Sequence, residues 1–160
     1  MKIQTRIQVS KRDSAFSAAH FLAEMGKCER LHGHNYFLSV QIAGEVDPRG
    51  VVADFNALDP AIAKACAPLD HKVLIPQNSP AIRLTESGAG LEIHFKHKRY
   101  LLPMEDCLLL PLASTTVESL ACYILEKITA ELGPAMERIS WIEVGVGEGG
   151  AQMAFCKKDF

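Results

Sequence analysis

The chain has 160 residues, of which 48% are hydrophobic and 22% charged, and its formal net charge at pH 7 is -2. These values predict one globular domain over residues 1–160, and the charge argues against broad binding to nucleic acid or to anionic membranes. The N-terminus lacks the apolar stretch of a secretory signal, and no apolar run is long enough to span a bilayer. Five cysteines without a repeating spacing do not suggest a disulfide framework, so we expect a cytoplasmic protein with reduced thiols.

Two strands and a helix are predicted in the first part of the chain. Apolar and polar residues alternate over 3–9, and a second strand is expected from about Asn35 to Val46. A helix is expected to follow Phe55, with Asn56 as its N-cap and Pro68 closing it.

A second, amphipathic helix gives the clearest pattern. Thr115 and Glu118 are expected to form a capping box at its start, and Gly133-Pro134 to end it. Its apolar face has helical spacing and consists of Val117, Leu120, Ala121, Ile124, Leu125 and Ile128.

The remaining segments complete the predicted fold. Residues 91–102 have the pattern of an inserted β-hairpin, and two further strands are expected at about 138–146 and 152–157. The order of elements indicates an α+β fold: an antiparallel four-stranded sheet with both helices on one face, plus the inserted hairpin.

The strongest chemical signal is the run from Cys28 to His34, which ends in His-Gly-His, together with His20 upstream. On an extended segment His32 and His34 point to the same side, and they share the parity of the apolar residues that follow. Inward polar groups need a partner, and three imidazoles with one open position are the ligand set of a catalytic zinc ion. We therefore expect Zn²⁺ on His20, His32 and His34, hereafter the histidine triad; the alternative is a polar pair at a strand entrance, with His20 unrelated.

Cys28 lies close in sequence to this expected metal site. A thiol near a dication and flanked by Lys27 and Arg30 should have a lowered pKa, which makes it a competent base or nucleophile. The alternative is a small buried residue, which is what we expect for Cys66 and Cys122 on helix faces.

Two other places carry side chains suited to chemistry. In Asp70-His71 the carboxylate can orient the imidazole for proton transfer if the pair lies in a turn; the alternative is a surface dipeptide. Glu148 ends an inward-facing apolar row, where a carboxylate can accept the paired N–H donors of a guanidine-like heterocycle. The alternative for Glu148 is a solvated turn residue.

Taken together, these segments resemble the family of 6-pyruvoyl-tetrahydropterin synthases and 6-carboxy-tetrahydropterin synthases. The resemblance covers most of the chain outside residues 76–112, and it implies the tunnelling fold, in which trimers close a β-barrel and two trimers stack into a hexamer with active sites between subunits. The matching pieces, in the family's order, are Phe16–His20, Cys28–Tyr36, Val52–Phe55, Leu69–His71, Thr116–Ala121 and Val146–Glu148.

The resemblance also implies roles for single residues. It implies zinc on the histidine triad, Cys28 as the proton-abstracting base, and assistance by Asp70 and His71 from the neighbouring subunit. The remaining implied residues bind the pterin: Glu148 as the anchor of the ring, with Thr115 or Thr116 nearby.

The implied substrate is 7,8-dihydroneopterin triphosphate. The Cys-x-x-x-His-Gly-His spacing fits the bacterial queuosine-pathway branch best, in which 6-carboxy-tetrahydropterin, acetaldehyde and triphosphate are formed; the sister branch forms 6-pyruvoyl-tetrahydropterin. Glu29 gives Glu-x-x-His-Gly-His in the same motif, as in a branch that cleaves dihydroneopterin to 6-hydroxymethyl-dihydropterin, and the alternative is an exposed loop carboxylate. A non-catalytic pterin or purine binder and a cyclohydrolase are the competing functions.

Overall fold

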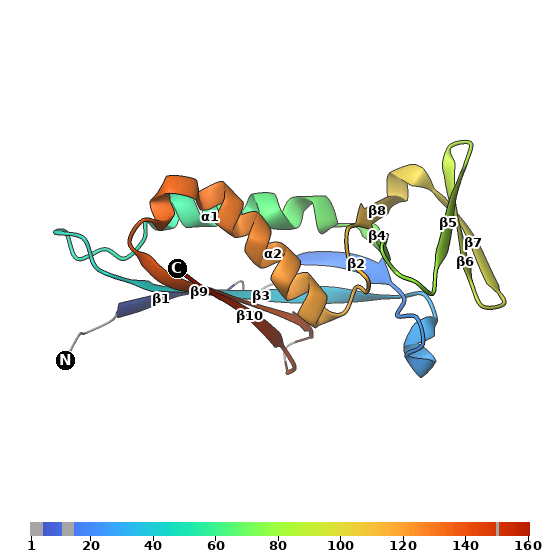
Figure 1. The fold of residues 1–160 in the computed structure, drawn as a ribbon, viewed down its shortest axis with the longest axis horizontal. Helices are drawn as coiled ribbons and strands as arrows, with labels where there is room; N and C mark the ends of the chain where they lie inside the picture. Colours follow the sequence, from blue (N-terminus) through green and yellow to red (C-terminus); the bar gives the residue numbers. More distant parts are fainter. Residues whose placement is uncertain (1–4, 11–14, 150) are drawn as a thin grey trace.

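The computed structural model describes residues 5–10, 15–149 and 151–160, in which seven strands form the main sheet (Figure 1). The strand order is β10-β9-β3-β2-β4-β8, and β1 pairs with β3 beyond the end of β2. The strands are β1 (Thr5–Ser10), β2 (Phe16–His20), β3 (His32–Gly44), β4 (Lys72–Pro76), β8 (Cys107–Leu110), β9 (Ile139–Glu148) and β10 (Ala154–Asp159).

Two helices, α1 (Phe55–Cys66) and α2 (Val117–Leu132), lie on one face of this sheet (Figure 1). Their apolar sides and the inward rows of β3 and β9 form the main hydrophobic core. This arrangement confirms the predicted α+β class with both helices on one side. The short 3-10 turns are η1 (Gly26–Glu29), η2 (Ala67–Leu69), η3 (Met104–Asp106) and η4 (Gly133–Met136).

The expected four antiparallel strands are only part of the sheet. Besides β1, β3, β9 and β10, the sheet contains β2 and two strands in parallel pairings, β4 on β2 and β8 on β4. These three strands have four or five residues each. So few residues hardly distinguish an alternating pattern from a short apolar run, which is why the sequence pattern does not reveal them.

Both helix starts differ from the prediction by one or two residues. Asp54, not Asn56, caps α1, because its carboxylate accepts the Asn56 main-chain N–H at 2.9 Å. Thr116, not Thr115, caps α2 and accepts the N–H of Ser119, so the expected capping box is not formed. Thr115 is instead fully buried.

The predicted hairpin over 91–102 is confirmed, and a third strand extends it to a three-stranded antiparallel sheet. It comprises β5 (Arg83–Ser87), β6 (Gly90–Phe95) and β7 (Lys98–Pro103), and it lies at one end of the molecule (Figure 1). Its inward residues Leu91, Ile93 and Phe95 form a second hydrophobic cluster with Phe21 and Ile75. The insertion therefore packs against the segment that directly follows His20.

The expectation of reduced thiols is wrong for one pair of cysteines. Cys122 on α2 and Cys156 on β10 form a disulfide, and Cys122 is exposed rather than buried. Cys28 and Cys107 lie outside this disulfide as free thiols, and Cys66 is buried as expected. No helix within the described residues has the length and apolar character needed to cross a membrane.

Candidate metal centre and active site

The pairing of β2 with β3 brings the histidine triad together. His20 stands opposite His32 in the antiparallel register, and His34 lies two residues further along β3 on the same face. One ring nitrogen of each histidine lies within 4.8 Å of the others, so the cluster could hold a metal ion. Within the described residues, Nε2 of His20 and Nε2 of His34 are buried without a hydrogen-bond partner. Such orphaned nitrogens fit a site built for a cation.

Main-chain carbonyl groups orient two of the three rings. Nδ1–H of His20 donates to the carbonyl oxygen of Thr115 at 3.0 Å, and Nδ1–H of His32 donates to that of Arg30 at 2.6 Å. A donor role for Nδ1 leaves the lone pair on Nε2 free for a metal, the arrangement that metal-ligating histidines commonly have. Thr115 therefore orients His20 through its main-chain carbonyl, and its side-chain Oγ1 also lies 3.3 Å from Nδ1 of His20.

Burial keeps His20 neutral. Removal of its ring from water is the main reason why the pKa of His20 is lowered to about 4. The hydrogen bond to Thr115 opposes this shift, and the nearby His32 and His34 contribute to it. A neutral imidazole is the form that binds a metal ion.

Glu148 lies at the edge of the histidine triad. The register of β9 on β3 puts it opposite Tyr36, and its carboxylate oxygens lie 3.4 Å from Nε2 of His20 and 3.5 Å from Nε2 of His34. Burial and the neighbouring Glu148 carboxylate raise the pKa of the Tyr36 hydroxyl. The carboxylate is partly exposed, so it can meet both the metal site and a ligand in front of it.

The loop between the two histidine-bearing strands carries Cys28 and Glu29. The main-chain N–H of Leu22 donates to the carbonyl oxygen of Cys28 at 2.8 Å, which folds η1 back onto the end of β2. Cys28 is half-buried with a free thiol. Glu29 forms an ion pair with Lys96 of the inserted sheet at 2.6 Å, and this contact lowers the pKa of the Glu29 carboxyl.

Asp70 and His71 form a turn after η2. Asp70 accepts the main-chain N–H of Ser17 and holds Nδ1 of His71, each at 2.8 Å, and these contacts lower the pKa of the Asp70 carboxyl. His71 has a positive φ of 57°, and its side chain is 83% exposed. Within the described chain, no hydrogen bond or ion pair joins this pair to Cys28 or to the histidine triad.

The Asp70–His71 pair borders the other side of the sheet. His71 lines an open pocket of about 660 Å³ together with Ser17, Ala19, Gly33 and Asn35. These strand residues alternate with the buried ones of β2 and β3, and therefore belong to the sheet face away from the helices. His34 of the histidine triad also lines this pocket, but Cys28 does not, so within the described chain the thiol and the acid–histidine pair do not share it.

Comparison with known proteins identifies the family. Residues 8–159 match the family model described as 6-pyruvoyl tetrahydropterin synthase. The chain belongs to this family. A relative from Methanocaldococcus jannaschii, named putative 6-carboxy-5,6,7,8-tetrahydropterin synthase, is 34% identical over 145 residues, which are 89% of each chain. Human 6-pyruvoyl tetrahydrobiopterin synthase is 38% identical over 100 residues, covering 51% of this chain and 68% of the human one.

Solved structures of the family have the same fold. The 6-pyruvoyl tetrahydropterin synthase of Plasmodium vivax aligns with a TM-score of 0.92 at 29% identity, over 99% of this chain and all of the other. The enzyme of Plasmodium falciparum aligns with a TM-score of 0.91 at 30% identity, over 98% of this chain and 99% of the other.

Two contacts of the site were not predicted. The sequence offers a run of basic residues at 96–99, but nothing in it indicates that Lys96 would reach Glu29, 67 positions away. The main-chain carbonyl that orients His20 leaves no signal at all, because every residue has one. Thr116, one of the two threonines expected near the pterin, serves as the N-cap of α2.

Proposed function

We propose that this chain is a zinc-dependent lyase that converts 7,8-dihydroneopterin triphosphate and water into 6-carboxy-5,6,7,8-tetrahydropterin, acetaldehyde and triphosphate. The observation that carries the proposal is the histidine triad, which has a free thiol in the adjoining loop. Two of its Nε2 atoms are buried and lack a hydrogen-bond partner among the described residues. The name of the Methanocaldococcus jannaschii relative supports the carboxy-pterin product.

The residues present fit zinc better than harder cations. Three neutral imidazoles suit a borderline-soft ion, whereas magnesium and calcium prefer oxygen ligands. The histidine triad would hold the ion and leave a position for substrate. Zinc bound there would act as a Lewis acid toward the hydroxyl groups of the substrate side chain.

Proton transfer in the proposed reaction falls to Cys28 and His71. Cys28, in its thiolate form, would remove a proton from the side chain of the substrate, and His71, oriented by Asp70, would hold or return protons. The observed Asp70–His71 contact fixes the tautomer in which Nε2 of His71 faces outward to do so. The pair and the thiol are apart within one chain, so we propose that a second copy supplies it, in the hexamer of two trimers typical of the tunnelling fold.

The pterin ring would be held by Glu148. Its carboxylate lies beside the triad with part of its surface open, which suits the paired N–H donors of the ring. Thr115 and Thr116 lie at the start of α2, and Thr115 contacts His20, so we place them at the same end of the site.

Glu29 is a second candidate base in the motif and suggests a second candidate product. One Plasmodium vivax structure that aligns with this chain, at a TM-score of 0.93 and 28% identity, is of a variant in which a catalytic glutamate is replaced by alanine. A chain with both Cys28 and Glu29 in its motif has the groups for two routes, and 6-hydroxymethyl-dihydropterin would be the product of the second.

The test is incubation of the zinc-loaded protein with 7,8-dihydroneopterin triphosphate, followed by mass spectrometry of the products. We expect carboxy-tetrahydropterin, one zinc ion per chain, and loss of turnover after a chelator has removed the zinc. Cys28→Ala should fold normally but lose turnover by about a hundredfold or more, as expected for loss of a general base. Cys107→Ala, which removes another free thiol, is the matched control. Full activity in Cys28→Ala contradicts the proposal, whereas binding without any product favours a pterin-binding protein.

A further inference from the structure

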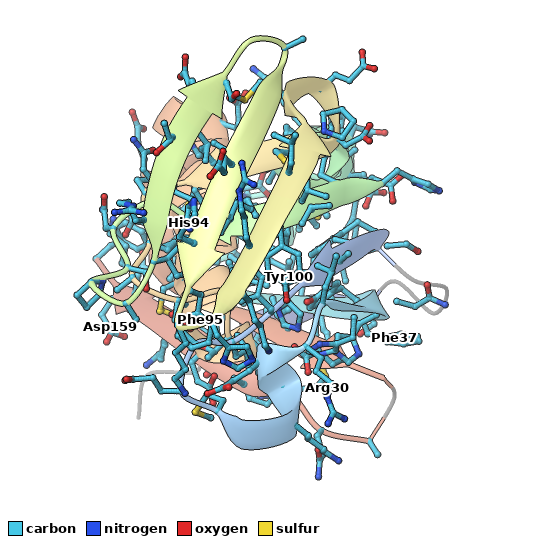
Figure 2. The ribbon with its side chains drawn as sticks, turned by 90° about the vertical axis from the view of Figure 1, so that its right-hand side faces the viewer. Arg30, Phe37, His94, Phe95, Tyr100 and Asp159 are labelled. Carbon is cyan, nitrogen blue, oxygen red and sulfur yellow. A yellow bond between two sulfur atoms is a disulfide. The ribbon has the colours of Figure 1, made fainter. Side chains whose placement is uncertain are left out.

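The inserted sheet reaches the loop that carries the reactive side chains. Nζ of Lys96 lies 2.6 Å from Oε1 of Glu29, and Nζ of Lys98 donates to the main-chain oxygen of Glu29, also at 2.6 Å. Figure 2 shows the β6–β7 end of the sheet, near the labelled Phe95, directly above the turn that leads to Arg30. Lys96 in the β6–β7 turn thus binds the carboxylate of Glu29, and Lys98 at the start of β7 binds its backbone.

The position of these lysines is fixed by packing. Phe95, next to Lys96, is buried with its ring 6.2 Å from that of Phe21, and Tyr100 stacks on Phe21 at 5.6 Å. Phe21 directly follows His20. The turn that carries Lys96 is therefore held at a set place relative to the histidine triad.

This contact directs the Glu29 carboxylate away from a role as base. Its side chain is only 17% exposed, and the Lys96 ammonium stabilises the charged form, so the pKa of Glu29 is lowered and its affinity for a proton falls. The Cys28 thiol, one residue earlier, has no hydrogen bond or ion pair in the described part of the chain and is free to react. Of the two potential bases of the motif, Glu29 is thus held in an ion pair and Cys28 is not.

We propose that Lys96 is a positioning residue that sets the product: by holding the Glu29 carboxylate on the inserted sheet, it keeps the reaction on the route that uses Cys28. The inference rests on the proposed function. Lys98 supports the arrangement by fixing the main chain at Glu29.

The competing route, with Glu29 as the base, is a retro-aldol cleavage, and it needs no oxidant or reductant. A carboxylate base takes the proton of the C2′ hydroxyl, and the C1′–C2′ bond breaks as the C2′ oxygen becomes an aldehyde. The electron pair passes into the C6–N5 imine of the dihydropterin and returns as C1′ is protonated. The products are 6-hydroxymethyl-dihydropterin and a two-carbon aldehyde that keeps the triphosphate.

The first test compares the products of Lys96→Met with those of the unmodified enzyme, both loaded with zinc. Since a positioned general base contributes at least about a hundredfold, partial release of Glu29 should raise the hydroxymethyl-to-carboxy product ratio by about tenfold. Lys96→Arg, which keeps the charge, should give the same product ratio as the unmodified enzyme. In the double variant Lys96→Met with Glu29→Gln, the increase in hydroxymethyl product should disappear. Lys64→Met is the matched control, because Lys64 forms an ion pair of similar length, 2.7 Å to Glu131, between α1 and α2.

A second measurement does not depend on turnover. Carbon-13 NMR titration of the glutamate carboxyls, with Glu29 assigned through Glu29→Gln, should give a higher Glu29 pKa in Lys96→Met than in the unmodified protein. Both Lys96 variants keep a non-glycine residue at the positive φ of 52°, so neither changes the backbone cost of the turn.

The outcomes separate the two proposals. If the unmodified enzyme makes carboxy-pterin but Lys96→Met gives an unchanged or lower hydroxymethyl ratio, the role of Lys96 is refuted and the proposed function stands. An unchanged Glu29 pKa in Lys96→Met also refutes that role. If the unmodified enzyme forms no pterin product, the proposed function fails, and the product-setting role of Lys96 fails with it.

Discussion

At the scale of single residues, the carboxylate of Glu148 lies close to two histidines of the triad. It lies 3.4 Å from Nε2 of His20 and 3.5 Å from Nε2 of His34, distances too long for strong hydrogen bonds. Nε2 of both rings has no other partner in the described structure. The Tyr36 hydroxyl also contacts this carboxylate. Because neither histidine binds the carboxylate tightly, it can turn toward a ligand, as expected of an anchor for substrate and not of a fixed metal ligand.

Glu148→Gln tests this role. The amide keeps the shape of the side chain but loses the charge, and one N–H donor now faces the donors of the pterin ring. Because hydrogen bonds to charged groups contribute about 1.5–3 kcal/mol, pterin affinity should fall by about 10- to 100-fold. Calorimetric titration with a dihydropterin measures the loss, and metal analysis should give an unchanged zinc content. A large loss of zinc would instead make Glu148 a ligand of the metal.

At the scale of elements, β9 places Glu148 opposite Tyr36 of β3, and the end of β9 packs closely against the segment that leads into β10. A Cβ added at Gly147 would lie 2.4 Å from the main-chain oxygen of Gln152 and 2.9 Å from Met153. A backbone oxygen cannot yield as a flexible side chain can. The glycine at 147 is thus explained by the close approach of the segment that leads into β10.

Gly147→Ala should therefore lower the free energy of unfolding by about 1–3 kcal/mol, the usual cost of overpacking. Chemical denaturation measures it. Gly33→Ala is the control. The added Cβ would lie 3.5 Å from the carbonyl oxygen of Ala18, an ordinary contact, and the backbone at Gly33 does not have a positive φ. Equal stability of the two variants would mean that β9 and β10 separate without cost at this point.

Local patterns predicted the long elements and missed what depends on pairing between distant segments. The face of α2, the rows of β3 and β9, and the shared side of His32 and His34 all follow from periodicity within one segment. The parallel strands β4 and β8, the third strand of the insertion and the Cys122–Cys156 disulfide depend on which segments meet in space. The Lys96–Glu29 contact belongs to the second kind, which is why motif spacing gave Glu29 two open interpretations.

At the scale of the whole molecule, the exposure of Asp70 and His71 points to the surface on which a second copy of the chain would pack. Their contact with each other and with Ser17 N–H is well formed, yet His71 faces an open pocket on the sheet side away from the helices. In the part of the chain that the structure describes, no hydrogen bond or ion pair joins this exposed acid–histidine pair to the Cys28 thiol. A second copy packed against this face would bring the pair to the thiol of its neighbour.

Subunit complementation tests this assembly. Cys28→Ala and His71→Ala should each be inactive alone, because each lacks one half of every site. If the two halves come from different chains, random mixing of unfolded variants followed by joint refolding should rebuild about a quarter of the sites with both groups intact. Turnover of the mixture should then reach about a quarter of the unmodified rate, while separately refolded variants combined afterwards stay inactive as long as subunits do not exchange. A mixture without activity, despite normal assembly in sedimentation, would mean that Cys28 and His71 act within the same chain, and that the exposed pair must move to reach the thiol.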